Sequence, residues 1–180
     1  MSAVDPPPSK EILYQGRFLR LVRQGSWEYA ERVGISGIVG LIPVTPQGEL
    51  VLVEQFRVPS GGSVVELPAG LAGDIAGQEH EALELAAARE LEEETGYRAG
   101  RLRRLMQGPN AAGSSSSQMT LFLADQLVKV GPGGGDEHED IIVHVVKLDA
   151  VWPWLQAQQA QGKMVDPKIF AGLWFAEHRP

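Results

Sequence analysis

The chain has 180 residues, of which 43% are hydrophobic and 22% are charged, a composition typical of one globular domain. Its formal net charge of −7 argues against a nucleic-acid or membrane-surface binder, because both partners are anionic, and the absence of cysteine excludes disulfides and thiol chemistry. The sequence has no apolar stretch of membrane-spanning length and no signal-peptide pattern at its N-terminus, so we expect a cytoplasmic protein without membrane contact.

The N-terminal part of the chain is expected to be mostly extended. Residues 1–10 contain three consecutive prolines and are predicted to be a disordered tail. Residues 11–32 interleave apolar and charged side chains, which predicts two or three short strands with a turn at Gly25. Short apolar runs then predict buried strands at 37–45, 50–56 and 64–67.

A helix is predicted over residues 81–94, which contain no glycine, proline or β-branched residue, with Gly96 as the C-terminal cap. The order of strands, helix, strands and helices indicates an α/β fold with a mixed sheet covered by helices, in one domain over residues 11–180. The remaining predicted elements are strands at 101–106, 118–124 and 141–148, and helices at 149–161 and from Asp166-Pro167 onward.

Three glutamates gather on one face of the predicted helix. Glu90, Glu93 and Glu94 are spaced i, i+3, i+4 and fall within an arc of about 100°. Like charges at this spacing repel, and Arg89 can pair with only one of them. A hard divalent cation such as Mg²⁺ would stabilise this arrangement, although a solvated, glutamate-rich helix end is the alternative.

The segment around this helix resembles a known family. Residues 89–97 (RELEEETGY) match the pattern R-E-U-x-E-E-x-G-U of the Nudix box, and Glu81 stands seven intervening residues before Arg89, as the box requires. The segments 53–57 (VEQFR), 66–70 (ELPAG), 136–146 and 165–168 are similar to the ADP-ribose and nucleoside-diphosphate-sugar pyrophosphatase branch. The resemblance extends from about Gly16 to Phe175.

This resemblance implies a Nudix-type α/β/α sandwich with a mixed sheet and an N-terminal antiparallel strand extension. It implies metal-dependent hydrolysis of the diphosphate of a nucleoside-diphosphate sugar, with ADP-ribose as the first choice and Mg²⁺, or Mn²⁺, as cofactor. It also implies a homodimer in which the strands of residues 11–35 contact the partner. The implied site comprises metal ligands Glu90, Glu94, Glu93, the Ala69 carbonyl and Glu139, catalytic residues Glu137 as the base and Glu93, and Arg57 on the phosphates.

Two aromatic residues are further candidates for substrate binding. Trp27 and Tyr29 lie in the predicted N-terminal strands, where an aromatic ring could stack on a nucleobase across the dimer. Packing in the core or in the interface is the equal alternative.

The sequence departs from the family pattern at two places. Ten residues separate Gly70 from Glu81 where the box has five, so the loop 71–80 is long and Glu79 competes with Glu81 for the early glutamate position. The loop 111–117 is rich in serine and lacks the proline and glutamate usual in the branch. GDP-mannose or another nucleotide sugar therefore stays open as substrate, and a non-catalytic nucleotide-sugar-binding Nudix module is the alternative from another class.

Overall fold

The computed structural model describes residues 8–135 and 139–178. Most of the predicted tail, residues 1–7, and the predicted base Glu137 lie outside this part of the chain. The tail prediction is wrong at Lys10, which begins strand β1 (Lys10–Gln15) and forms an ion pair of 2.6 Å with Glu31. The preceding run of prolines does not predict this contact, because it depends on the pairing of strands that are distant in the sequence.

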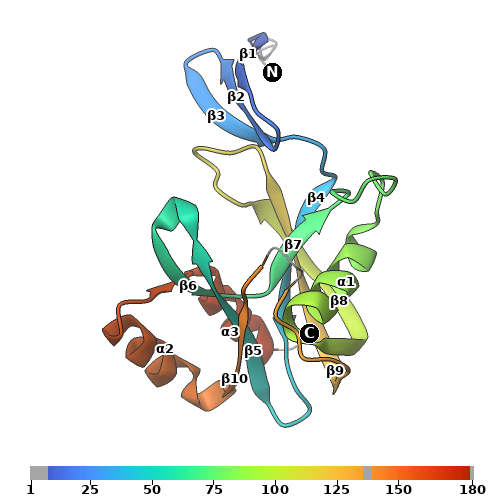
Figure 1. The fold of residues 1–180 in the computed structure, drawn as a ribbon, viewed down its shortest axis with the longest axis vertical. Helices are drawn as coiled ribbons and strands as arrows, with labels where there is room; N and C mark the ends of the chain where they lie inside the picture. Colours follow the sequence, from blue (N-terminus) through green and yellow to red (C-terminus); the bar gives the residue numbers. More distant parts are fainter. Residues whose placement is uncertain (1–7, 136–138, 179–180) are drawn as a thin grey trace, which may run out of the picture.

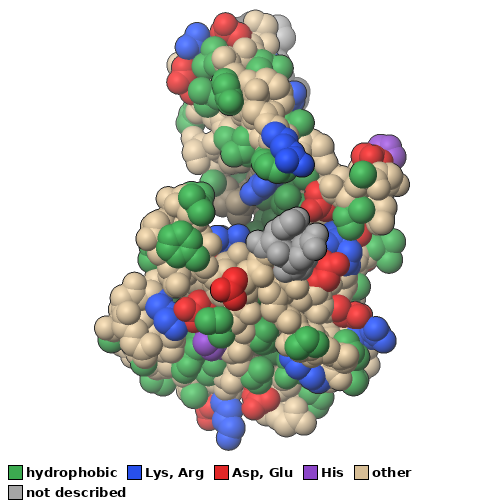
Figure 2. All heavy atoms as spheres, in the orientation of Figure 1, with side chains coloured by type: hydrophobic (Ala, Val, Ile, Leu, Met, Phe, Trp, Pro, Cys, Tyr) green, Lys and Arg blue, Asp and Glu red, His purple; other side chains and the backbone are tan. Residues whose placement is uncertain are grey.

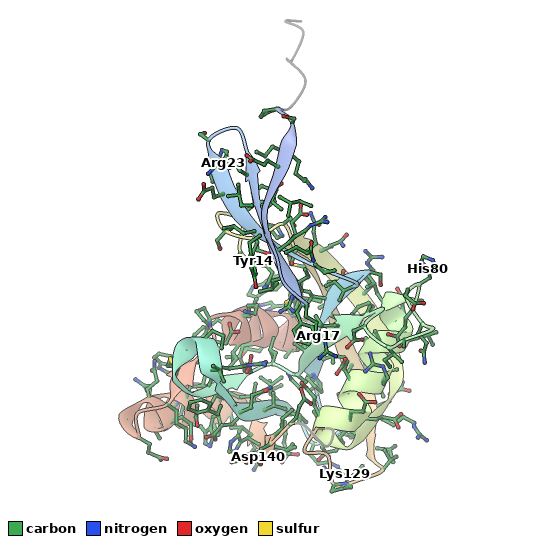
Figure 3. The ribbon with its side chains drawn as sticks, turned by 45° about the horizontal axis from the view of Figure 1, so that its top comes forward. Tyr14, Arg17, Arg23, His80, Lys129 and Asp140 are labelled. Carbon is green, nitrogen blue, oxygen red and sulfur yellow. The ribbon has the colours of Figure 1, made fainter. Side chains whose placement is uncertain are left out.

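The N-terminal strands form a separate antiparallel sheet. β1 pairs with β2 (Leu19–Gln24), which pairs in turn with β3 (Trp27–Arg32). Gly25 occupies the β2–β3 turn with a φ of 62°, as predicted. This sheet rises from the body of the molecule (Figure 1) and carries the labelled Tyr14 and Arg23 (Figure 3).

The body contains two four-stranded mixed sheets, where the sequence indicated one. In the first, the order is β7 (Ala69–Ala72), β4 (Gly37–Pro43), β9 (Gln118–Lys129) and β8 (Tyr97–Pro109), with β4 and β9 parallel. In the second, the order is β10 (Ile142–Lys147), β5 (Glu49–Arg57), β6 (Gly62–Glu66) and β11 (Met164–Val165), with β6 and β11 parallel. Every other strand pairing in these two sheets is antiparallel.

Helices cover the sheets on both sides, which gives the expected α/β/α layering (Figure 1). Helix α1 (Leu83–Thr95) buries Ala86, Ala87 and Leu91 against β4 and β9, and burial of the leucine alone contributes roughly 1.5–3 kcal/mol. The second core cluster lies under α2 (Val151–Ala160) and α3 (Lys168–Glu177). Short 3₁₀ turns at Val58–Ser60 and Leu148–Ala150 complete the fold. In the described part of the chain no helix is long and apolar enough to span a membrane.

The end of α1 is fixed by glycines. Gly96 caps the helix with a φ of 68° and donates its N–H to Glu92 at 2.9 Å, as predicted. A Cβ at this position would lie 2.3 Å from the carbonyl oxygen of Gly131. The close approach brings the glycine-rich loop 131–135 against the last turn of the helix, where Glu93 and Glu94 lie.

Candidate active site

A cavity of about 560 Å³ opens between the end of α1, strands β5–β7 and the start of α3. Figure 2 shows a hollow with basic side chains between the N-terminal sheet and the body. The cavity is lined by four of the predicted site residues, Arg57, Ala69, Glu90 and Glu139. Its other charged or amide-bearing lining residues are Arg32, Glu66, Asp74, Asn110, Asp166 and Lys168.

Two of the helix carboxylates are buried beside β7. Glu94 is 2% exposed, and its carboxylate accepts a hydrogen bond of 3.1 Å from the backbone N–H of Ala69. Glu90 packs so closely on Gly70 that a Cβ there would lie 1.9 Å from the Glu90 carboxyl carbon. Burial is the main cause that raises the pKa of Glu90 to about 7 and the pKa of Glu94 to about 9. Burial outweighs the attraction of Arg89 for Glu90 and of Arg57 for Glu94, so additional positive charge would stabilise the ionised form of both carboxylates.

Arg89 organises the remaining acidic side chains. Its Nη1 donates to Glu90 at 3.0 Å and to Glu93 at 2.9 Å, while Nη2 donates to the carbonyl oxygen of Leu71 at 3.0 Å. Glu93 is thus the most exposed of the three helix glutamates and is held by Arg89 rather than directed into the cavity. The guanidinium fixes the carboxylates relative to β7.

The structure shows which of Glu81 and Glu79 takes the early glutamate position of the Nudix box beside Arg89. The Glu81 side chain is only 5% exposed and lies 3.3 Å from Arg89, and it also accepts the N–H of Gly73 at 3.4 Å. Glu79 is exposed and accepts the N–H of Gly77 at 2.9 Å. The five extra residues therefore form a loop that projects from the body, with His80 at its edge (Figure 3). Glu81, which follows this loop, still occupies the position beside Arg89.

The glycine-rich loop is hydrogen-bonded to the acidic end of α1. Gly134 N–H donates to the carbonyl oxygen of Glu94 at 2.9 Å, and Gly135 N–H donates to that of Glu93 at 3.0 Å. These bonds satisfy two carbonyl groups at the helix terminus, which have no partner within the helix. They also bring Glu139 to the cavity, where its negative charge is one of the causes that raise the pKa of Glu94, after burial.

Arg57 lies at the end of β5, with its guanidinium at the cavity. Its Nε donates to Glu66 at 2.7 Å, across the β5–β6 pair. The carboxylate holds one edge of the guanidinium, which leaves the two Nη groups as donors for a planar, anionic ligand.

Trp27 and Tyr29 lie outside this cavity. They line a second pocket of about 420 Å³ together with residues of the serine-rich loop 111–117. The loop is bound to β3 by hydrogen bonds from Ala30 N–H to Ser114 O at 2.9 Å and from Ser116 N–H to Ala30 O at 3.1 Å. Trp27 is 63% exposed, so packing in the core of this chain does not explain its position.

Sequence reasoning missed several residues that line the main cavity. Arg32 and Asn110 line it from the side of β3 and of the loop after β8, and Asp166 and Lys168 line it at the start of α3. The segment 165–168 belongs to the family resemblance, but the resemblance implies no site residue within it. Nothing in the local sequence distinguishes Arg32 from the other charged residues of the N-terminal strands.

The donor atoms at α1 fit a hard divalent cation. Within residues 8–135 and 139–178, no three acidic or histidine side chains are already arranged as a metal cage. The available ligands are nevertheless oxygen atoms, from the buried carboxylates of Glu90 and Glu94, from Glu139 and from the backbone of Ala69. Oxygen-rich sites with few protein ligands suit Mg²⁺, which retains water molecules.

The α/β sandwich thus places the acidic half of α1 beside a cavity that contains Arg57, a combination suited to a metal ion and a ligand that carries phosphate. The NUDIX domain family matches residues 36–169, and the chain belongs to this family. The expected family and the α/β fold class are confirmed.

Named relatives agree with this assignment. The chain is 33% identical to an ADP-ribose pyrophosphatase of Bacillus subtilis over 66% of this chain and 65% of that protein, slightly less than two thirds of its length. It is 29% identical to a GDP-mannose pyrophosphatase of Pectobacterium atrosepticum over 73% of this chain and 70% of that protein. A crystal structure described as an ADP compounds hydrolase superposes with a TM-score of 0.72 at 20% identity, covering 99% of this chain and 96% of the other.

Proposed function

We propose that this protein hydrolyses the diphosphate bridge of a nucleoside-diphosphate sugar, with ADP-ribose as the first choice, to a nucleoside monophosphate and a sugar phosphate. The observation that carries the proposal is that Glu90 and Arg57 line one cavity, with the buried carboxylate of Glu94 held next to it on the backbone N–H of Ala69. The carboxylates need a cation, and an arginine beside them is suited to bind phosphate oxygens. The B. subtilis relative supports ADP-ribose as the first choice.

Glu90, Glu94, Glu139 and the Ala69 carbonyl would hold Mg²⁺ or Mn²⁺, with Glu93 as a further ligand or water-positioning group. When bound, such a cation neutralises the charge of the diphosphate and lowers the pKa of a coordinated water. The raised pKa of Glu94, caused mainly by burial, favours this assignment because a cation would replace the proton that the carboxylate otherwise retains near neutral pH.

The chain's own groups would carry the rest of the reaction. Arg57 binds and orients the phosphates, and Arg32 offers a second guanidinium at the same cavity. A carboxylate takes the proton of the attacking water, a bond forms from the water oxygen to phosphorus, and the bond from that phosphorus to the bridging oxygen breaks. Glu137 is the proposed base. Glu93 is the alternative, and it must first leave Arg89.

The nucleobase would occupy the second pocket, against Trp27 and Tyr29. The serine-rich loop beside these aromatic rings replaces the usual loop of the branch, so GDP-mannose or another nucleotide sugar is the second candidate substrate. A non-catalytic binding module is the alternative from another class, and the retention of Glu90, Glu93 and Glu94 argues against it.

We further propose a cytoplasmic homodimer that forms through the strands of residues 11–35. Large apolar side chains of this segment are exposed in the single chain, and they include Tyr14 at 68%, Phe18 at 65% and Trp27 at 63%. Apolar area of this kind is usually covered by a partner. A monomer mass in light scattering at working concentration would contradict the dimer.

The first experiment is a hydrolysis panel of nucleoside-diphosphate sugars and nucleoside triphosphates, with Mg²⁺, with Mn²⁺ or with a chelator, run beside the Glu94→Gln variant. We expect metal-dependent release of phosphomonoester from ADP-ribose or GDP-mannose, and its loss in the variant. Ligand binding in a thermal-shift assay without turnover of any compound would reject the enzyme and favour the binding module.

A further inference from the structure

The start of α3 lines the same cavity as Glu90 of α1. Asp166 Oδ1 accepts the backbone N–H of Lys168 at 2.8 Å, and Asp166 Oδ2 lies 2.6 Å from the Lys168 ammonium. The backbone N–H of Asp166 donates to Val65 O at 2.9 Å, which ties this segment to β6. The acidic and the basic group are therefore presented to the cavity as one fixed pair.

The chemistry of this pair suits hydroxyl groups better than a phosphate. An ammonium has three donors on a single nitrogen, so any ligand of Lys168 also lies close to the Asp166 carboxylate. A phosphate oxygen has only acceptor capacity and negative charge, and Asp166 would repel it. A sugar hydroxyl is neutral, can accept from Lys168 and can donate to Asp166.

The two arginines of the cavity differ from Lys168 in this respect. Glu66 contacts Arg57 at Nε, and the Nη donors lie at the other end of the planar group. Arg32 has no carboxylate partner among the residues that the structure describes. In the described part of the chain neither guanidinium group has a carboxylate bound to its Nη donors, so both can bind an anion directly, which places the diphosphate near Arg57.

We propose that Asp166 and Lys168 form the sugar-recognition element of the site, which binds adjacent hydroxyls of the sugar and determines which nucleotide sugar is accepted. The inference rests on the proposed function and deepens it. Asn110 and Arg32 border the cavity on the side of the pocket that contains Trp27 and Tyr29. A base on that side and a diphosphate at Arg57 direct the sugar toward the start of α3.

The test uses Lys168→Met, with Lys168→Arg as the conservative variant. Lys147→Met is the matched control, because Lys147 is exposed at the end of β10 and does not line the cavity. The kinetic constants are measured for ADP-ribose and for GDP-mannose, and the dissociation constants of ADP and GDP, which lack the sugar, are measured by calorimetry. Asp166→Asn is avoided as the primary variant because the Asp166 carboxylate also accepts the backbone N–H of Lys168, the first residue of α3.

We expect Lys168→Met to lower kcat/KM for the nucleotide sugar by about 10- to 100-fold, while the affinity for the nucleoside diphosphate stays within about twofold. Lys168→Arg restores part of the loss, and Lys147→Met behaves as the wild type. An equal loss for the diphosphate and for the nucleotide sugar would make Lys168 a phosphate ligand and overturn the proposal. Unchanged constants for all ligands would overturn it as well.

Failure of the proposed hydrolase is a separate outcome. It would appear as a wild-type protein that turns over no nucleotide sugar. In that case calorimetry compares ADP-ribose with ADP, and GDP-mannose with GDP. A preference for the sugar-bearing ligand that Lys168→Met abolishes supports the recognition element. Equal wild-type affinities within both pairs reject it.

Discussion

Replacing Gly70 by alanine tests how the fold positions the Glu90 carboxylate. The new Cβ would lie 1.9 Å from Cδ, 2.1 Å from Oε1 and 2.3 Å from Cγ of Glu90, whereas non-bonded carbon atoms need about 3.5 Å. Gly70 does not have the positive φ that disfavours alanine, so the backbone can stay in place. The Glu90 side chain must therefore move by more than about 1 Å.

Activity and stability should respond very differently to this substitution. A flexible side chain can rotate away at a cost of about 1 kcal/mol in the free energy of unfolding. A displacement of about 1 Å at the proposed metal ligand Glu90 is expected to lower kcat/KM by roughly 100-fold. The assay combines kcat/KM for the nucleotide sugar, Mn²⁺ affinity by electron paramagnetic resonance and thermal unfolding with chelator present.

Two controls make the reasoning refutable. Gly108→Ala adds the same methyl group in β8, where no described atom lies within 4 Å of the new Cβ, and should keep full activity. The double variant Gly70→Ala/Glu90→Gln should be no worse than Glu90→Gln alone, since both changes act on one carboxylate. Full activity of Gly70→Ala, or additive losses in the double variant, would refute the claim that Gly70 acts through Glu90.

Three further predictions concern charged residues around the site. Burial raises the pKa of Glu94 from its ordinary 4.5 to about 9 in the folded protein. With chelator present, the stability that this group contributes is therefore complete below pH 4.5 and is lost as the pH rises toward 9. The unfolding free energy of Glu94→Gln, measured by denaturant titration, should therefore rise relative to that of the wild type by roughly 2–5 kcal/mol from pH 5 to pH 8. A difference between the two proteins that does not change with pH would contradict this prediction. Arg57→Ala should lower kcat/KM by about 100-fold, and Arg57→Lys should lower it by less, because lysine supplies charge without the planar guanidinium. Equal kcat/KM for the wild type and both variants would show that Arg57 does not bind the substrate. Glu81→Gln should lower the unfolding free energy by about 1–3 kcal/mol because it releases Arg89, while substitution of the exposed Glu79 by glutamine should leave it almost unchanged. The reverse order in thermal unfolding would assign the early glutamate position of the Nudix box to Glu79.

Local features of the chain could be predicted because local physics determines them. Helix α1 and its Gly96 cap follow from a run of helix-forming residues with glycine at its end. The longer strands follow from apolar runs in the same way. The short strands β7 and β11 were not predicted, since Ala69–Ala72 has little strand propensity and is extended only because it pairs with β4.

The placement of Trp27 and Tyr29 shows the limit of a local reading. Their sequence suggested either packing or stacking on a base, and nothing within the strands decides between these roles. The pocket beside them exists because a loop more than 80 residues later in the chain bonds to Ala30. The serine-rich loop and the two aromatic residues are distant in the sequence but line the same pocket.

The sequence by itself determined the family, the acidic helix and the residue types needed for phosphate chemistry, because the Nudix box places its carboxylates on one face of a single helix. Only the tertiary structure decided that Glu81 rather than Glu79 contacts Arg89, that Glu66 orients Arg57, and that Lys168 shares a cavity with Glu90. These contacts join segments that lie far apart along the chain or beyond an outward loop. Their geometry depends on how the two sheets and their covering helices pack, which no local pattern of residues specifies.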